Sequence, residues 1–107
     1  MTASLSRLEI LVLLALARLG DEGYGVAVHA AISEATGKDF SMAAVYVAME
    51  RLEEQQLTKT RTSEPRPERG GRSRRYHALT AKGEAALRHE RAVMEQMWKG
   101  ESGGRKR

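Results

Sequence analysis

Two short strand-like segments, 57–62 and 74–79, enclose a loop-forming segment in a chain whose other patterns are helical. The first strand-like segment is rich in threonine and alternates in character, which is typical of a β-strand. The enclosed residues 63–72 contain both prolines of the chain and a Gly-Gly pair, which disfavour helix and predict a loop. The chain is therefore expected to form one two-stranded hairpin among helices.

Helical patterns lie on both sides of this hairpin. The first, over about 6–19, is apolar on almost every face, so this helix is expected to be buried in its own chain or shared with a partner. A second helix is expected over about 23–35, with Gly37 as its C-terminal glycine. The third and fourth, over about 41–55 and 80–98, each begin at a hydroxyl side chain that can cap a helix.

Positive charge gathers around the hairpin. Between residues 59 and 75, seven basic side chains stand against two acidic ones, a net charge of +5, and residues 105–107 add three more positive charges. The whole chain carries only +4, so its remaining residues sum to −4. Six of the seven basic side chains are arginines, whose planar guanidinium suits phosphate. A solvated charge run is the alternative, but the cluster on a loop favours nucleic acid as partner.

Several classes of protein are excluded. The chain has no cysteine, so it has no disulfides, no thiolate zinc site and no cysteine nucleophile. Its longest apolar run, 10–17, is too short to span a membrane, and no signal peptide precedes it, so we expect a cytoplasmic location. The three histidines lie on different expected elements, which predicts no metal site, and no nucleotide-binding or nucleophile motif is present. We expect neither an enzyme nor a cofactor.

The order of three helices, a hairpin and a final helix predicts a mainly α (α+β) fold. This is the order of a winged helix-turn-helix with a two-stranded wing and an appended C-terminal dimerisation helix. With 107 residues the chain has room for one compact domain. We expect a winged DNA-binding domain over 5–79, the dimerisation helix over 80–99 and a disordered basic tail over 100–107.

The third helix and the hairpin carry the expected contacts to double-stranded DNA. Small apolar side chains on the outward face of the helix suit thymine methyl groups, while its serine and tyrosine suit phosphates or base edges. The helix arginine either reaches phosphate or pairs with a neighbouring glutamate. Arginines at the loop tip suit a narrow minor groove and those of the returning strand suit phosphates; the alternatives are an ordinary amphipathic helix and a solvated hairpin. The expected DNA-binding residues are Ser41, Ala43, Ala44, Tyr46, Val47, Arg51, Arg66, Arg69, Arg72, Arg74 and Arg75.

Apolar residues of the first and last helices are expected to meet a second copy of the chain. The simpler interpretation is a packed dimer core. The other is that paired tryptophans line a pocket for a planar apolar effector. The residues of this dimer interface or effector pocket are Leu8, Leu11, Leu87, Met94, Met97 and Trp98.

Three segments resemble the PadR family of bacterial transcriptional regulators: 23–25 (GYG), 45–53 (VYVAMERLE) and 70–83 (GGRSRRYHALTAKG). The resemblance covers about residues 8 to 90 and is to the compact subgroup with a single C-terminal helix. It implies a homodimer that binds a near-palindromic operator, usually as a repressor, with the third helix in the major groove. The chain departs from the family pattern at Val47, where proline is common, and at Gln56, where glycine is usual.

The residues and the resemblance together predict a sequence-specific DNA-binding regulator of transcription, a homodimeric repressor that a small-molecule effector could release. Two alternatives stay open: a winged-helix module for protein interaction, and a non-specific nucleic-acid binder. All three would use the basic hairpin. A large affinity ratio between an operator and random duplex DNA separates the first from the others.

Overall fold

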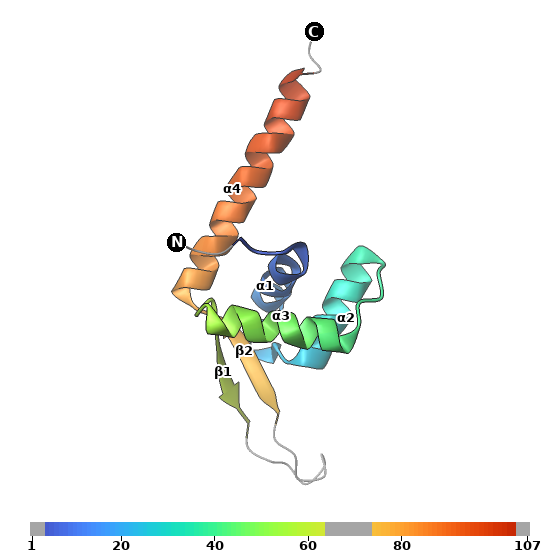
Figure 1. Cartoon of the computed structure of the whole chain (residues 1–107), viewed down its shortest axis with the longest axis vertical. Helices are drawn as coiled ribbons and strands as arrows, with labels where there is room; N and C mark the ends of the chain where they lie inside the picture. Colours follow the sequence, from blue (N-terminus) through green and yellow to red (C-terminus); the bar gives the residue numbers. More distant parts are fainter. Residues whose placement is uncertain (1–3, 64–73, 105–107) are drawn as a thin grey trace.

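A computed structural model describes residues 4–63 and 74–104, with side chains as far as Lys99. The elements follow the expected order, three helices, a hairpin and a last helix (Figure 1). They are α1 (Arg7–Leu19), the short 3-10 helix η1 (Gly20–Glu22), α2 (Gly25–Thr36), α3 (Met42–Glu54), β1 (Thr58–Thr62), β2 (Arg75–Leu79) and α4 (Ala81–Gly104). The predicted mainly helical winged fold is confirmed.

Side-chain caps fix where the helices begin. The Ser6 hydroxyl accepts a hydrogen bond from the Glu9 amide at 3.1 Å, and the Glu9 carboxylate accepts one from the Ser6 amide at 2.8 Å. This reciprocal box satisfies two amides that the first turn of α1 leaves unpaired. The expected cap of α3 is present as well, since the Ser41 hydroxyl accepts from the Ala44 amide at 3.0 Å.

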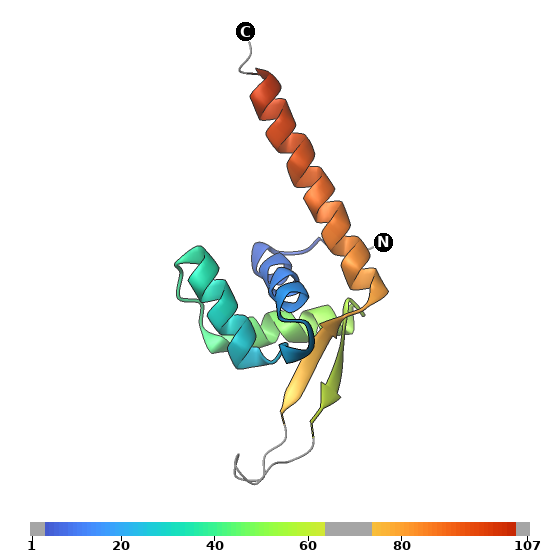
Figure 2. The same ribbon diagram turned by 180° about the vertical axis from the view of Figure 1, so that it is seen from behind.

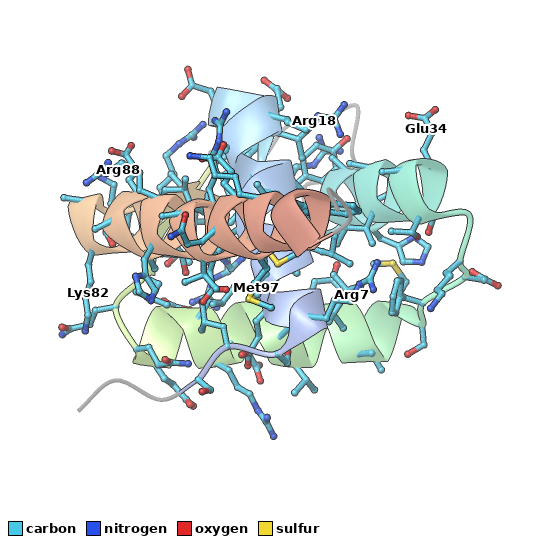
Figure 3. The ribbon with its side chains drawn as sticks, turned by 90° about the horizontal axis from the view of Figure 1, so that it is seen from above. Arg7, Arg18, Glu34, Lys82, Arg88 and Met97 are labelled. Atoms are coloured by element: carbon cyan, nitrogen blue, oxygen red, sulfur yellow. The ribbon has the colours of Figure 1, made fainter. Side chains whose placement is uncertain are left out.

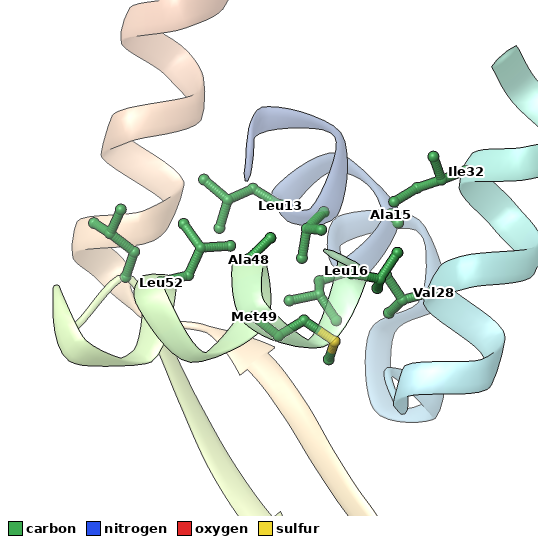
Figure 4. Close-up of a cluster of buried hydrophobic side chains, with 11 residues drawn as sticks. Leu13, Ala15, Leu16, Val28, Ile32, Ala48, Met49 and Leu52 are labelled. Carbon is green, nitrogen blue, oxygen red and sulfur yellow. The ribbon is translucent and has the colours of Figure 1, made fainter. Parts of the chain in front are cut away.

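The core lies between the first three helices, and α1 is at its centre (Figure 4). Val12 and Leu13 of α1 are fully buried, and α1 contacts α2, α3, β2 and α4. Burial on several sides within one chain explains much of the apolar pattern of α1, although Leu14 is 45% exposed. The buried core residues are Val12, Leu13, Ala15, Leu16, Val28, Ile32, Val45, Ala48, Met49, Leu52 and Leu57.

The hairpin is antiparallel, with Thr58 opposite Leu79 at one end of the strands and Thr62 opposite Arg75 at the other. The residue that precedes α2, Tyr24, forms an isolated bridge with Tyr76, and the His77 amide donates to the Gly23 carbonyl at 2.8 Å. The start of α2 is thereby attached to the edge of β2. The position of the wing relative to the helices is set by backbone hydrogen bonds.

A joint made of hydrogen bonds connects the end of α3 to the start of α4, although the hairpin separates the two helices in the chain. Gln56 adopts a positive φ of 64°, the conformation in which glycine is usual. The Thr80 hydroxyl donates to the Gln56 carbonyl at 2.7 Å and accepts from the Gly83 amide at 3.0 Å, so it joins the turn after α3 to the first turn of α4. The Lys82 ammonium, beside the end of α3 in Figure 3, donates to the Gln55 carbonyl at 3.1 Å. A Cβ on Gly83 would lie only 2.1 Å from the Leu57 carbonyl oxygen.

Beyond this joint, α4 projects from the helical body on the side opposite to the hairpin strands (Figures 1 and 2). It continues to Gly104, so the expected end of the helix at about residue 98 and a tail beginning at 100 are corrected. That end was placed where the apolar spacing stops, and this spacing indicates which residues can pack and not where the backbone of a helix ends. Residues 105–107 lie outside the described residues. Among the helices of the described residues, none is both long and apolar enough to cross a membrane.

Candidate nucleic-acid interface

A groove of about 910 Å³ runs between the start of α2, one side of α3 and strand β2. It brings residues that are far apart in the chain, the second helix and the wing, to one surface. Its lining mixes aromatic, basic and acidic side chains: Tyr24, Gly25, Val26, Tyr46, Met49, Glu50, Glu53, Glu54, Arg74, Arg75 and His77.

The residues expected on the outward face of α3 are exposed or half-buried. Tyr46 and Val47 are 46% and 48% exposed, and Ala43 and Arg51 are exposed as well. Ala44 is half-buried, and the Ser41 hydroxyl is occupied as the helix cap. The N-terminal half of α3 therefore presents a surface of small and aromatic side chains, while its C-terminal half adds Glu50, Glu53 and Glu54 to the groove.

The ring of Tyr46 lies against the start of α2. A Cβ on Gly25 would come within 2.5 Å of this ring and its hydroxyl, so only glycine permits the contact. Within the described residues, no side chain caps the start of α2. Uncapped amides at a helix start carry partial positive charge. The start of α2 and the Tyr46 hydroxyl therefore both provide hydrogen-bond donors to the groove.

Two arginines and two tyrosines stack in a row where the strands of the wing pass the start of α2. The Arg74 guanidinium carbon lies 3.8 Å from the centre of the Tyr24 ring, and the Arg61 guanidinium carbon lies 4.4 Å from that of Tyr76. The two rings meet edge to face with centres 5.7 Å apart. Such cation–π contacts fix a guanidinium over an aromatic face. The order Arg74–Tyr24–Tyr76–Arg61 is called the wing-base stack below.

The second expected arginine of the returning strand has a different partner. Arg75 forms an ion pair with Glu53 of α3 at 3.2 Å, and the Thr60 hydroxyl donates to the same carboxylate at 3.3 Å. The pair is largely exposed, so it contributes at most about 1 kcal/mol to stability. It ties the wing to α3 and neutralises one of the glutamates that line the groove.

His77 lies at the inner side of the groove and is buried. Burial lowers the pKa of its imidazole, the charge of Arg75 lowers this pKa further, and Glu53 partly opposes the shift. Its buried Nδ1 atom has no hydrogen-bond partner among the residues that the structure describes, which also disfavours a proton there. In the part of the chain that the structure describes, no three acidic or histidine side chains gather as a metal ion would require.

The expected dimer or effector residues fall into two groups. Leu8, Leu11 and Leu87 are half-buried and pack against the core of their own chain. Met94, Met97 and Trp98 are 53%, 67% and 66% exposed, and Val93 beside them is exposed as well. Their spacing of three and four residues places the exposed group along one side of α4.

Some residues of this surface were not among the predicted contacts. Arg61 belonged to the basic cluster, yet its position over Tyr76 was not foreseen. Tyr24 belongs to the segment 23–25 that resembles the family, and its contacts with Arg74 and Tyr76 join elements that are distant in the sequence. The predicted loop-tip residues Arg66, Arg69 and Arg72 lie outside the described residues.

Comparisons with known proteins identify relatives of the whole fold. A family model described as the transcriptional regulator PadR-like family matches residues 12–89. A PadR family regulator from Clostridium difficile is similar over 92% of this chain and 97% of its own, with 23% identity and a TM-score of 0.76. A PadR family regulator from Eggerthella lenta is similar over 90% of this chain and 81% of its own, with 27% identity and a TM-score of 0.69.

A third similar structure is BpsR of Bordetella bronchiseptica, whose DNA binding is regulated by 6-hydroxynicotinic acid. It shares 25% identity over 94% of this chain and 67% of its own, with a TM-score of 0.68. No curated protein sequence matches this chain.

Proposed function

Because this chain belongs to the PadR-like family of transcriptional regulators, we propose that it is a homodimeric repressor that binds a near-palindromic operator. The family and the similar structures are regulators of transcription and not enzymes. The observation that carries the proposal is the exposed N-terminal half of α3 beside the arginine-bearing base of the wing.

The distribution of charge along α3 supports contact with DNA through its first two turns. Ala43, Tyr46 and Val47 bring no negative charge to a major groove, and the N-terminal residues of a recognition helix are those that reach base edges. The glutamates follow in the C-terminal half, where they would repel phosphates. Since Arg75 pairs with Glu53, the repulsion is smallest beside the wing.

The donors along the groove suit the phosphate backbone beside that contact. The start of α2, which no side chain of the described residues caps, the Tyr46 side chain and the Arg74 side chain all line the groove. Contacts of this kind position a protein on the duplex without reading its sequence. Base contacts from α3 would then provide the specificity.

The exposed apolar side of α4 supports a second copy of the chain as partner. Val93, Met94, Met97 and Trp98 are all exposed, and a monomer gains nothing from a tryptophan and two methionines in water. A symmetric pair of such helices buries the same surface on both copies and presents two α3 helices to two half-sites. We also propose that a planar apolar effector binds between the two Trp98 side chains. The likeness to BpsR, whose DNA binding is regulated by a small aromatic acid, supports the planar shape of such an effector.

The proposal is tested by selecting operators from random duplex DNA with the purified protein. We expect an inverted repeat that binds at least about a hundredfold more tightly than scrambled duplex at the same salt concentration. Arg74→Ala should weaken binding to both duplexes and reduce the salt slope, whereas Arg88→Ala, which removes an exposed arginine on α4, should leave both unchanged. Weak binding without an enriched motif would identify a non-specific binder, and no binding at all would identify an interaction module.

A further inference from the structure

The wing-base stack fixes the side chain of Arg74 at the mouth of the groove. Its guanidinium lies flat on the Tyr24 ring, 3.8 Å from the ring centre. Tyr24 is itself held from behind, because Tyr76 meets it edge to face and the two residues form a backbone bridge. Arg61 closes the far end of the stack over Tyr76 and donates to the Asp21 carbonyl at 3.3 Å.

The backbone of Arg74 is fixed as well. Its amide donates to the Ser63 hydroxyl at 2.9 Å, and its carbonyl accepts from the Ser63 amide at 2.8 Å. Both the main chain and the end of the side chain are therefore held by neighbouring elements. A long side chain that is already ordered loses less conformational entropy when it binds a ligand than one that is mobile.

Stacking occupies the flat face of a guanidinium and leaves its N–H groups, which lie in the plane, available for other partners. Within the described residues, the Arg74 side chain has no hydrogen bond or ion pair. Arg75, the next residue, instead uses its N–H groups on Glu53. Of these two neighbouring arginines, Arg74 is the one whose donors can bind an anion in the groove without first breaking an ion pair.

We propose that Tyr24 is a positioning residue for DNA binding, whose ring holds the Arg74 guanidinium ready to bind a backbone phosphate in the groove. The proposal rests on the DNA-binding function proposed above. Tyr24 does not itself contact the phosphate; it acts through Arg74. This role differs from simple packing, because a packing residue would affect DNA affinity whether or not Arg74 is present.

A double-mutant cycle on the full chain and its selected operator tests the difference. Tyr24→Leu is expected to weaken operator binding about threefold for each protomer, which is about tenfold for a dimer. In a chain that already carries Arg74→Ala, the same Tyr24→Leu change is expected to alter the affinity less than twofold. An equal loss with and without Arg74 would overturn the proposal.

A second series removes any dependence on folding of the leucine variant. Tyr24→Phe keeps the ring face, so it is expected to bind the operator within twofold of the parent. Replacing this phenylalanine with increasingly fluorinated analogues of the same shape withdraws charge from the ring face and should weaken binding stepwise. Equal affinity across the fluorinated series would contradict a role for the ring face. If the parent chain shows no preference for the operator, the proposed function fails. If the parent binds the operator well but Tyr24 and Arg74 show no coupling, the positioning role of Tyr24 fails and the proposed function stands.

Discussion

The two halves of α4 have opposite relations to the rest of the chain. The first half docks on the body: Gly83 is buried, and Ala86 and Leu87 pack against the core. In the second half every side chain from Arg91 to Lys99 is exposed, although this half holds the only tryptophan of the chain. The second half of α4 therefore has the larger apolar side chains, yet all of them are exposed.

This contrast shows that the side chains of α4 are buried where the backbone of the helix comes close to the rest of the chain. The number of apolar residues does not decide which half is buried. The inner half docks because Thr80 and Lys82 bind the carbonyls that end α3, and because Gly83 allows the helix to come close to Leu57. Within the described residues, the outer half has no such neighbour in its own chain. The proposed dimer would cover its apolar side, and each half can be tested separately.

The largest effect is expected from removing apolar surface in the outer half. The double variant Met94→Gln/Trp98→Gln should raise the dimer dissociation constant by at least about a hundredfold, since two large side chains from each copy lose their burial. The free energy of unfolding of the monomer should change little, because both side chains are exposed. Analytical ultracentrifugation and thermal melts at low protein concentration measure the two quantities.

Arg88→Gln is the matched control for that variant, as it changes an exposed α4 side chain without removing an apolar contact. It should leave the dissociation constant within about twofold, or about 0.4 kcal/mol. If the double variant stays as dimeric as the control, the outer half of α4 is not the dimer surface and the contrast between the halves loses its explanation.

The next effect concerns the inner half. Gly83→Ala should lower the free energy of unfolding by about 2 kcal/mol, because the new Cβ meets the Leu57 carbonyl and the helix must move away. Helix propensity alone predicts the opposite sign, a gain of about 1 kcal/mol. Urea unfolding decides between them, with Glu84→Ala, at the exposed neighbouring position, as the control. A stabilised Gly83→Ala chain would contradict the close docking of α4.

A smaller effect, in the stabilising direction, is expected at the joint. Gln56→Gly should raise the free energy of unfolding by about 0.5 kcal/mol, because the relief of a positive φ in a residue with a side chain exceeds the entropy cost of glycine. Gln56→Ala keeps the Cβ and should show no such gain. Chemical unfolding of the three chains measures the difference, and an equal stability of the alanine and glycine variants would show that the turn is not strained.

The smallest effect is a dependence of the free energy of unfolding on pH, which arises from the buried His77. Burial and the charge of Arg75 hold the pKa of His77 below its usual value of 6.5, so the unfolded chain takes up a proton first as the pH falls. Stability from this residue is complete above the unfolded pKa and is lost on acidification through it. Thermal melts between about pH 7.5 and about 5.5 should show a shallower decline for His77→Gln than for the parent. His89→Gln, at an exposed position on α4, should retain the full decline.

The sequence sufficed for the elements and their order. The spacing of apolar residues, the caps at Ser41 and Thr80, and the two strand-like segments are local signals, and each is confirmed. The proline- and glycine-rich residues between the strands lie outside the described residues. Gln56, which stands where the family pattern has glycine, adopts a positive φ. Local signals work here because caps and turns are made by residues within a few positions of each other.

The partners of the arginines could not be predicted in the same way. Arg74 and Arg75 are adjacent and chemically identical, yet one stacks on Tyr24 and the other pairs with Glu53. The difference depends on how β2 lies against α2 and α3, which is a long-range property of the fold. The same holds for Leu8, Leu11 and Leu87, whose helical spacing is equally compatible with the core of one chain and with a dimer interface.

The joint between α3 and α4 makes the last helix a rigid lever. Its 24 residues correspond to a rod about 36 Å long, and the turn at its base has no spare residue to act as a hinge. In the proposed dimer, a swing of about 5° between the two rods would shift the two winged bodies relative to one another by roughly 3 Å, close to the rise of one base pair. A molecule bound between the far ends of the rods would therefore move both α3 helices away from their half-sites while each chain stays folded.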